Sequence, residues 1–174
     1  IGSDGQITVN QNNPTLTLGT NTTVNTQDYF HAKLSSTQTI SDGTWTEIAF
    51  NKVNDPNNWF NNTSKKFQPT KAGKYFVFIQ SPFYSNSGLN KSEAQNVFLK
   101  KNSTALDATE TYLVAKSQID VRDGAMYASS LALTAFVDMN GSSDYLYSLV
   151  YQNTNAGTAI LEETFHFSGF KIGS

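Results

Sequence analysis

The pattern of hydrophobic positions is most informative in a strand-like segment near the middle of the chain, which reads KYFVFI. In a β-strand, Tyr75, Val77 and Ile79 would point to one face, and Phe76 and Phe78 to the other. A strand that is apolar on both faces needs cover on both faces. Because the chain shows no sustained helical periodicity, we expect the opposite sheet of a sandwich to cover one face and a neighbouring subunit to cover the other.

The C-terminal segment repeats this pattern, because residues 165–172 read FHFSGFKI and neither face is cleanly polar. We therefore predict that the two segments form central, neighbouring strands. Other strand-like runs are separated by Asn, Asp and Gly turn signals. They cover residues 29–34, 44–53, 96–100, 109–117, 125–138, 145–152 and 159–172. Many strands with turns between them and no helices predict an all-β sandwich or jelly roll.

The first 28 residues differ from the rest, because they are rich in Asn, Thr, Gln and Gly and contain no aromatic residue. We predict an extended N-terminal arm or docking segment over residues 1–28 and a folded domain over residues 29–174. The arm is either a flexible linker that lies on the domain or a segment that orders on a larger assembly. Since the first residue is Ile, we expect a processed chain or a fragment.

Composition and charge exclude several classes of partner. The chain has 174 residues, which is enough for one domain with a sizeable core. A formal net charge of -2 gives no electrostatic reason to expect nucleic acid or an anionic membrane. No apolar run approaches a transmembrane span. There is no cysteine, so disulfides are excluded, and a source other than a secreted animal module is favoured.

Three stretches resemble the globular C1q-like domain, which is related to the tumour necrosis factor (TNF) jelly roll. FQP at residues 67–69 and AGKY at residues 72–75 resemble the family's Phe-x-x-Pro followed by Gly-x-Tyr. DYLY at residues 144–147 resembles its Gly-Asp-x-Val strand opening, and FSGFKI at residues 167–172 its terminal Phe-Ser-Gly-Phe-x-Leu. A cysteine-free, Asn- and Thr-rich domain of this kind is similar to those on bacteriophage virions, in fibres, knobs or capsid decorations.

The resemblance implies a homotrimer of C1q/TNF-like jelly rolls, each with about ten antiparallel strands. It implies a binding or structural function without catalysis or a cofactor. We expect a location on the virion surface, attachment to the larger virion assembly through the N-terminal arm, and a host surface glycan or protein as a candidate ligand. The alternative is a secreted, extracellular C1q-like recognition protein.

The resemblance also suggests which residues form the trimer interface. Since the family's counterpart of Tyr75 lies within the sandwich, we assign Phe76 and Phe78 to the trimer side. A one-residue slip of the last strand would exchange its two faces, so its contribution stays open. The neighbours of the two phenylalanines are therefore either Phe165 and Phe167 or His166 and Phe170.

Catalytic and metal-binding patterns are weak. The two histidines, His31 and His166, lie in predicted strands, where we expect structural roles, and no nucleophile-elbow, phosphate-loop or His-rich metal motif is present. Acidic loops at residues 120–124 and 138–144 contain calcium-type oxygen ligands, but Asp, Asn and Gly are also ordinary turn formers, and we predict turns without a metal. A polysaccharide-active enzyme remains the alternative from another class.

Aromatic residues in turn-rich segments are candidates for sugar stacking. Trp59 and Phe60 lie within the loop sequence NDPNNWFNN, and Tyr84 ends the central apolar segment. Together they form our candidate ligand-binding loop. The alternative interpretation is that these side chains cap the core or pack in an interface.

Overall fold

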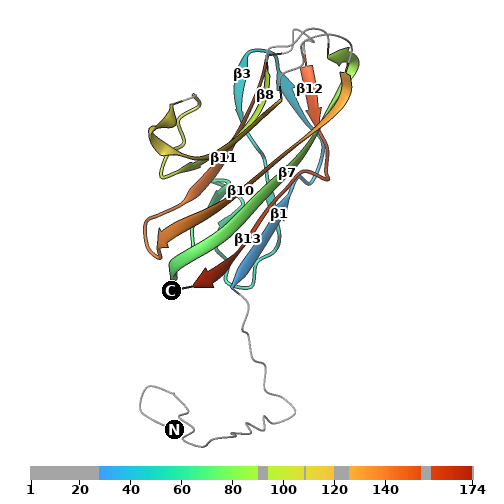
Figure 1. The fold of residues 1–174 in the computed structure, drawn as a ribbon. Coiled ribbons are helices and arrows are strands. Elements are labelled where there is room, and N and C mark those ends of the chain that lie inside the picture. Colours follow the sequence, from blue (N-terminus) through green and yellow to red (C-terminus); the bar gives the residue numbers. More distant parts are fainter. Residues whose placement is uncertain (1–27, 90–93, 108, 120–125, 154–157, 174) are drawn as a thin grey trace, which may run out of the picture.

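The computed structural model describes residues 28–89, 94–107, 109–119, 126–153 and 158–173 (Figure 1). Among these residues, thirteen strands form two antiparallel sheets, and one short 3₁₀ turn, η1 (Glu110–Tyr112), precedes β9. No described helix is long and apolar enough to cross a membrane. The all-β prediction is therefore confirmed. The arrangement of the two sheets determines where the predicted interface residues lie.

Seven of the described strands form sheet A, in which the long central strand β7 pairs with β10 on one edge and with β13 and β12 on the other. β13 continues to β1 and β4, and β12 continues to β2. The strands are β1 (Tyr29–Lys33), β2 (Gln38–Ser41), β4 (Asn51–Asn54), β7 (Ala72–Leu89), β10 (Met126–Asn140), β12 (Thr158–Leu161) and β13 (His166–Gly173).

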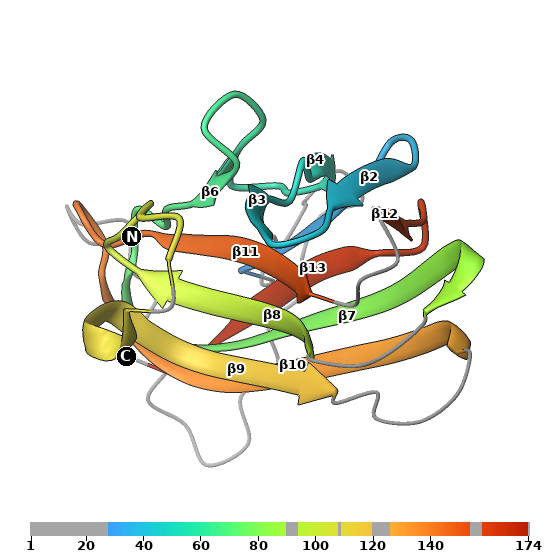
Figure 2. The same ribbon diagram turned by 90° about the horizontal axis from the view of Figure 1, so that it is seen from above.

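The other six described strands form sheet B, in which β11 pairs with β8 on one edge and with β6 and β3 on the other. Figure 2 shows the strands of sheet B as a second layer over those of sheet A. They are β3 (Thr44–Glu47), β5 (Phe60–Asn61), β6 (Lys66–Phe67), β8 (Ala94–Lys101), β9 (Leu113–Ile119) and β11 (Leu146–Asn153).

The core lies between the two sheets and is rich in aromatic side chains. Tyr75, Val77 and Ile79 of β7 are buried in it, as their spacing predicted. The ring of Phe30 in β1 stacks on that of Phe67 in β6 with centroids 4.0 Å apart, so the pair joins the two sheets. Burying one such side chain contributes roughly 1.5–3 kcal/mol, which makes this aromatic layer a main source of stability.

The two segments with apolar residues on both faces are neighbours, as predicted. β7 and β13 pair antiparallel with Phe76 opposite Phe170 and Val77 opposite Gly169. Gly169 is required by close packing, because a Cβ at this position would lie 2.7 Å from Val77 Cγ1 and 2.9 Å from Phe30 Cε1. The absence of a side chain at Gly169 therefore lets the ring of Phe30 lie against β13.

Three predicted strands differ from the observed ones. The run 159–172 is not one strand, because β12 ends at residue 161 and β13 begins at residue 166. The run 44–53 is not one strand, because β3 belongs to sheet B and β4 to sheet A. The chain crosses between the sheets at residues 48–50, where the side-chain amide of Gln38 donates to Glu47 O at 2.7 Å and accepts from Ala49 N at 2.9 Å. The run 109–117 begins with η1, and its strand ends later, at residue 119.

The outer face of sheet B carries a smaller aromatic cluster, to which alternate residues of β11 contribute. Phe98, Tyr147 and Leu149 are buried there, and the Trp45 and Tyr151 rings stack with centroids 4.7 Å apart. Tyr147 also donates its hydroxyl hydrogen to the carboxylate of Glu47. Neighbouring side chains cover this second cluster, in contrast to the outer face of sheet A.

Candidate protein interface on sheet A

The outer face of sheet A presents aromatic rings from three strands around Phe76. Because Tyr75 and Val77 point into the core, Phe76 and Phe78 point away from it. Phe136 of β10 and Phe170 of β13 are paired with Phe76 from either side, with ring centroids 5.2 and 5.6 Å from its ring. We call this group, together with the two histidines described below, the aromatic surface. Its members are His31, Phe76, Phe78, Phe136, His166 and Phe170.

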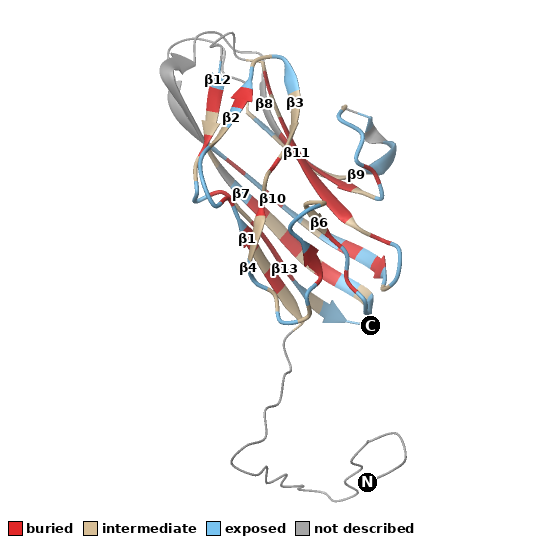
Figure 3. Ribbon diagram, turned by 180° about the vertical axis from the view of Figure 1, so that it is seen from behind, coloured by how far each residue is buried: buried red, intermediate tan, exposed pale blue. Residues whose placement is uncertain are grey.

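The two rings on either side of Phe76 are far more exposed than is usual for phenylalanine. Phe136 is 67% exposed and Phe170 is 45% exposed. Figure 3 shows buried and exposed segments along β10. From residue 130 to residue 140 the even-numbered positions are exposed, and Phe136 is one of them. Single exposed apolar residues are common on protein surfaces, but rings in mutual contact form a continuous patch. Such a patch is typical of an interaction surface.

The register of β13 decides which of its residues join this surface. Phe170 is opposite Phe76, and His166 lies on the same face, where its ring meets that of Phe78 edge-on at 5.5 Å. Phe165 and Phe167 are fully buried in the core instead. Their assignment to the interface is therefore wrong, because odd-numbered positions here face sheet B, and the alternative pair of His166 and Phe170 is the one on the outer face.

Phe136 belongs to the aromatic surface but was not among the predicted interface residues. Along β10, Leu131, Leu133, Val137 and Met139 are buried. Phe136 is the large aromatic residue on the opposite face, which otherwise carries small or polar side chains. An aromatic residue at a position where the alternating pattern places small or polar residues is the signal in the sequence that could have identified Phe136.

The two histidines lie at the other end of the aromatic surface. The rings of His31 in β1 and His166 in β13 have centroids 5.8 Å apart. His31 Nδ1 lies 2.6 Å from Ser168 Oγ, and His166 Nδ1 is 3.0 Å from the carbonyl oxygen of Thr164, to which it donates. Burial, the neighbouring His166 and then Lys33 lower the pKa of His31 below its usual 6.5. Both histidines thus lie in strands or at a strand end, in contact with neighbouring groups of sheet A.

Two hollows flank His31, so the outer face of sheet A is not flat. One of about 570 Å³ lies beside Phe78 and Phe170 and extends to Asp28. The other, of about 650 Å³, is lined by both histidines, and also by Lys33, Gln80, Pro82, Ser130, Glu163 and Thr164. Because rings project beside two hollows, the surface has a shape that a complementary protein surface can match.

The predicted ligand-binding loop is not supported at two of its three residues. Trp59 and Phe60 are each 2% exposed. The indole of Trp59 donates to Thr70 Oγ1 at 2.9 Å, and its ring meets that of Tyr75 edge-on. Neither ring offers a free face to a sugar, so the alternative of core capping holds for both. Tyr84 lies in β7 opposite Ala128, and its side chain lies outside the described part of the chain.

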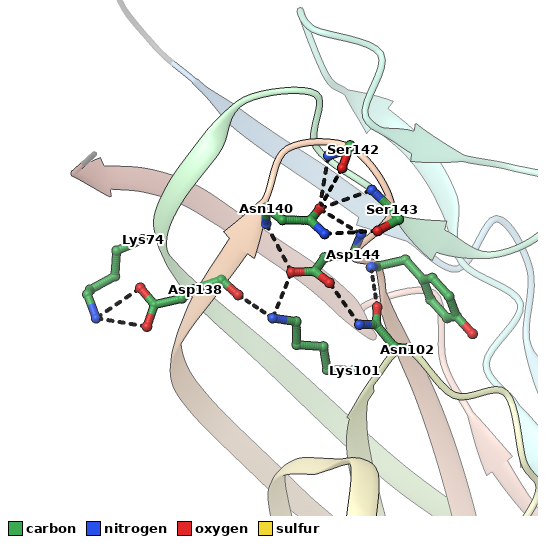
Figure 4. A network of polar contacts seen from close by, with 9 residues as sticks. Lys74, Lys101, Asn102, Asp138, Asn140, Ser142, Ser143 and Asp144 are labelled. Atoms are coloured by element: carbon green, nitrogen blue, oxygen red, sulfur yellow. Dashed lines mark hydrogen bonds and ion pairs between the residues drawn. The ribbon is translucent and has the colours of Figure 1, made fainter.

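The acidic segment between β10 and β11 forms a turn held by protein donors (Figure 4). Asn140 Oδ1 accepts the backbone N–H groups of residues 142, 143 and 144, each at 3.0 Å. Asp144 accepts from Asn140 N at 2.9 Å and Asn102 Nδ2 at 2.8 Å, and pairs with Lys101 Nζ at 2.8 Å. These oxygen atoms accept the hydrogen bonds that stabilise the turn, as predicted.

The contacts of Asp144 have an electrostatic consequence. The hydrogen bonds from Lys101 and Asn102 hold the pKa of its carboxyl below the ordinary 3.8. Within the described residues, no three His, Asp or Glu side chains are placed to share a metal ion. The second acidic loop, at residues 120–124, lies outside the described residues.

Asp28 is the first residue that the structure describes. Its carboxylate pairs with Lys71 Nζ at 2.6 Å, and its carbonyl oxygen accepts from Lys171 N at 2.8 Å. Strand β1 begins at the next residue. The predicted arm lies outside the described residues apart from Asp28, which these contacts hold against β13 and the segment before β7.

Comparison with known proteins identifies the fold. No protein-family model and no curated protein matches the sequence. Among solved structures, murine APRIL at pH 5.0 is 11% identical, with a TM-score of 0.60 over 84% of this chain and 99% of that chain. The globular domain of zebrafish complement 1qA is 14% identical, with a TM-score of 0.59 over 84% and 97% of the respective chains.

A third similar structure, the Eiger TNF of S. frugiperda, is 13% identical, with a TM-score of 0.57 over 85% of this chain and 94% of that chain. The similarity covers nearly the whole length of each of these domains. At such low identity it establishes the fold alone, which is the C1q/TNF-like jelly roll that the three sequence stretches predicted.

Proposed function

We propose that this protein is a non-enzymatic structural and binding module that forms a homotrimer through the aromatic surface. We further propose that it serves as a jelly-roll knob on a bacteriophage virion, as a fibre or capsid decoration. The observation that carries the proposal is the contiguous group of exposed rings around Phe76. The resemblance to the C1q/TNF-like domain supplies the threefold arrangement.

The energetics of the aromatic surface favour a second copy as its occupant. Phe136 and Phe170 leave about half or more of their surface to solvent in the single chain. Removing apolar surface from water is worth roughly 25 cal/mol for each Å², and a closed symmetric assembly repeats every contact in each subunit. Lys74 and Asp138, which lie on the same face next to Phe76 and Phe136, pair with each other at 3.1 Å, so their burial would not leave a single charge unpaired.

The virion location is supported by composition and by the arm. The chain is free of cysteine and rich in Asn and Thr, like the phage-borne domains that it resembles. Because Asp28 is tied to Lys71, the arm starts from a fixed point on the domain. In our proposal the arm docks into the parent particle, and surfaces outside the interface bind a host glycan or protein.

Catalysis is not part of the proposal, although a serine and a histidine are in contact. His31 Nδ1 and Ser168 Oγ form the pair that a nucleophilic enzyme would require. Ser168 is only 7% exposed, however, and lies within β13, with β7 and β1 on either side. Although Ser168 lines the hollow beside Phe78 and Phe170, its side chain is almost fully buried against His31, and we assign the contact a structural role.

The experiment that tests the assembly is light scattering on the full chain at micromolar concentration. We expect a mass of three times 19.1 kDa, and a mass of 19.1 kDa alone would reject the trimer. A host-cell binding assay and a glycan array then separate an adhesin from a decoration without a ligand. Hydrolysis of host polysaccharide by the purified chain would support the enzyme alternative.

A further inference from the structure

The two histidines of the aromatic surface are neighbours by the geometry of the sheet. β1 and β13 pair antiparallel, with His31 opposite Ser168 and Lys33 opposite His166. His31 and His166 are therefore diagonal neighbours on one face, which is the face that carries Phe78. A partner subunit that covers the phenylalanines therefore also covers these imidazoles or lies next to them.

The surroundings of His31 disfavour its protonation. Lys33 lines the same hollow as both imidazoles, and Glu163 is the carboxylate that faces it there. On the other side, the second hollow brings Asp28 and Lys171 to His31. Burial of His31, the nearby His166 and the Lys33 ammonium all act in one direction, so that the neutral imidazole is favoured.

We propose that His31 and His166 form a pH-responsive element within the trimer interface, which releases folded subunits when the surroundings become mildly acidic. The inference rests on the proposed trimer and adds its regulation. The ring of His166 packs edge-on against that of Phe78, and beside it the surroundings of His31 favour the neutral imidazole. Once protonated, the two imidazoles place two positive charges on the contact surface of each subunit, next to Lys33.

The direction of the effect follows from linkage between protonation and assembly. Covering His31 removes water, which disfavours the charged imidazole and lowers its pKa in the trimer relative to the free subunit, where it already lies below 6.5. Its contribution to trimer stability is therefore intact at neutral pH and is lost as the pH falls through the still lower value in the trimer. For each unit of this lowering, the trimer weakens by up to about tenfold per histidine.

The test is sedimentation velocity on the full chain at about pH 7.5 and about pH 5, with a chelator present to exclude bridging metal ions. We expect trimers at the higher pH and single subunits at the lower pH, with the same far-ultraviolet circular dichroism spectrum. The control carries His31→Asn and His166→Asn, because an Asn amide can keep a polar group near each Nδ1 position. This variant should stay trimeric at both pH values.

The outcomes separate the inference from the proposed function. Single subunits of the wild type at about pH 7.5 would reject the proposed trimer itself. A wild-type trimer at both pH values, a wild type that unfolds at about pH 5, or a double variant that dissociates like the wild type would overturn only the pH-responsive element. If the double variant does not assemble, Lys33→Gln replaces it, and the inference requires that it dissociate at a higher pH than the wild type, because loss of the ammonium raises the pKa of His31.

Discussion

At the scale of single residues, Gly169 shows how tightly sheet A is packed beneath the aromatic surface. We predict that Gly169→Ala lowers the free energy of unfolding by roughly 1–3 kcal/mol, because the new methyl group must displace Val77 and Phe30. Urea denaturation followed by circular dichroism measures the change. The matched control is Gly173→Ala, where a Cβ meets nothing within 4 Å. Equal stability of the two variants would show that β13 can shift without cost.

A second residue-scale prediction concerns Asp144. Since Lys101 and Asn102 lower its pKa, it stabilises the folded state above about pH 3.8, and this contribution is lost as the pH falls through the lowered value. We expect Asp144→Asn to cost roughly 1–2 kcal/mol near neutral pH and progressively less toward pH 2. Asp138→Asn is the control, because its bond to Lys74 is exposed and should contribute little. A constant difference between wild type and variant across the acid range would contradict this role.

Single residues were also where the sequence was hardest to interpret. Trp59 and Phe60 stand among Asn, Asp and Pro, which are residues of exposed turns. Their burial arises because β5 and β6 bring them back over the core, near Phe67 and Tyr75, a tertiary contact without a local pattern. The turn at Asn140 was predictable, by contrast, because its hydrogen bonds are local.

At the scale of elements, the two faces of β7 make opposite predictions. Phe76→Asp should yield folded but dissociated subunits, because three unpaired carboxylates would otherwise share a dry interface. Tyr75→Asp should prevent folding, because it places a charge in the core. Size-exclusion chromatography measures the oligomeric state of both variants, and circular dichroism shows whether each is folded. Soluble monomers from Tyr75→Asp and an unfolded Phe76→Asp would mean that the faces are assigned the wrong way round.

The sequence predicted elements well where an alternating or doubly apolar pattern ran for six or more residues, as in β7, β10 and β11. It did not determine the face of β13, because both of its faces are apolar and only pairing with β7 sets the register. The sequence pattern also predicted one strand over residues 44–53, where the structure has β3 and β4. Ile48 and Phe50 keep an alternating spacing while the chain changes sheets, and a regular pattern hides that crossing.

At the scale of the whole molecule, the arm and the domain should be separable. We predict that deleting residues 1–26 leaves the jelly roll folded and trimeric but abolishes incorporation into the parent particle. Asp28 and its bond to Lys71 remain in this truncated chain. Thermal unfolding monitors the fold, and co-purification with particles monitors incorporation. A truncated chain that no longer folds would show that the arm belongs to the domain, and normal incorporation would exclude it as the docking segment.

The central claim is that the aromatic surface holds three copies together, and sedimentation equilibrium of the wild type beside Phe136→Asp tests it most directly. Phe136 is 67% exposed in the single chain, so the substitution should leave folding intact. We predict three times 19.1 kDa for the wild type and 19.1 kDa for a folded variant. A wild type that sediments as one chain, or a Phe136→Asp variant that still sediments as three, would contradict the account.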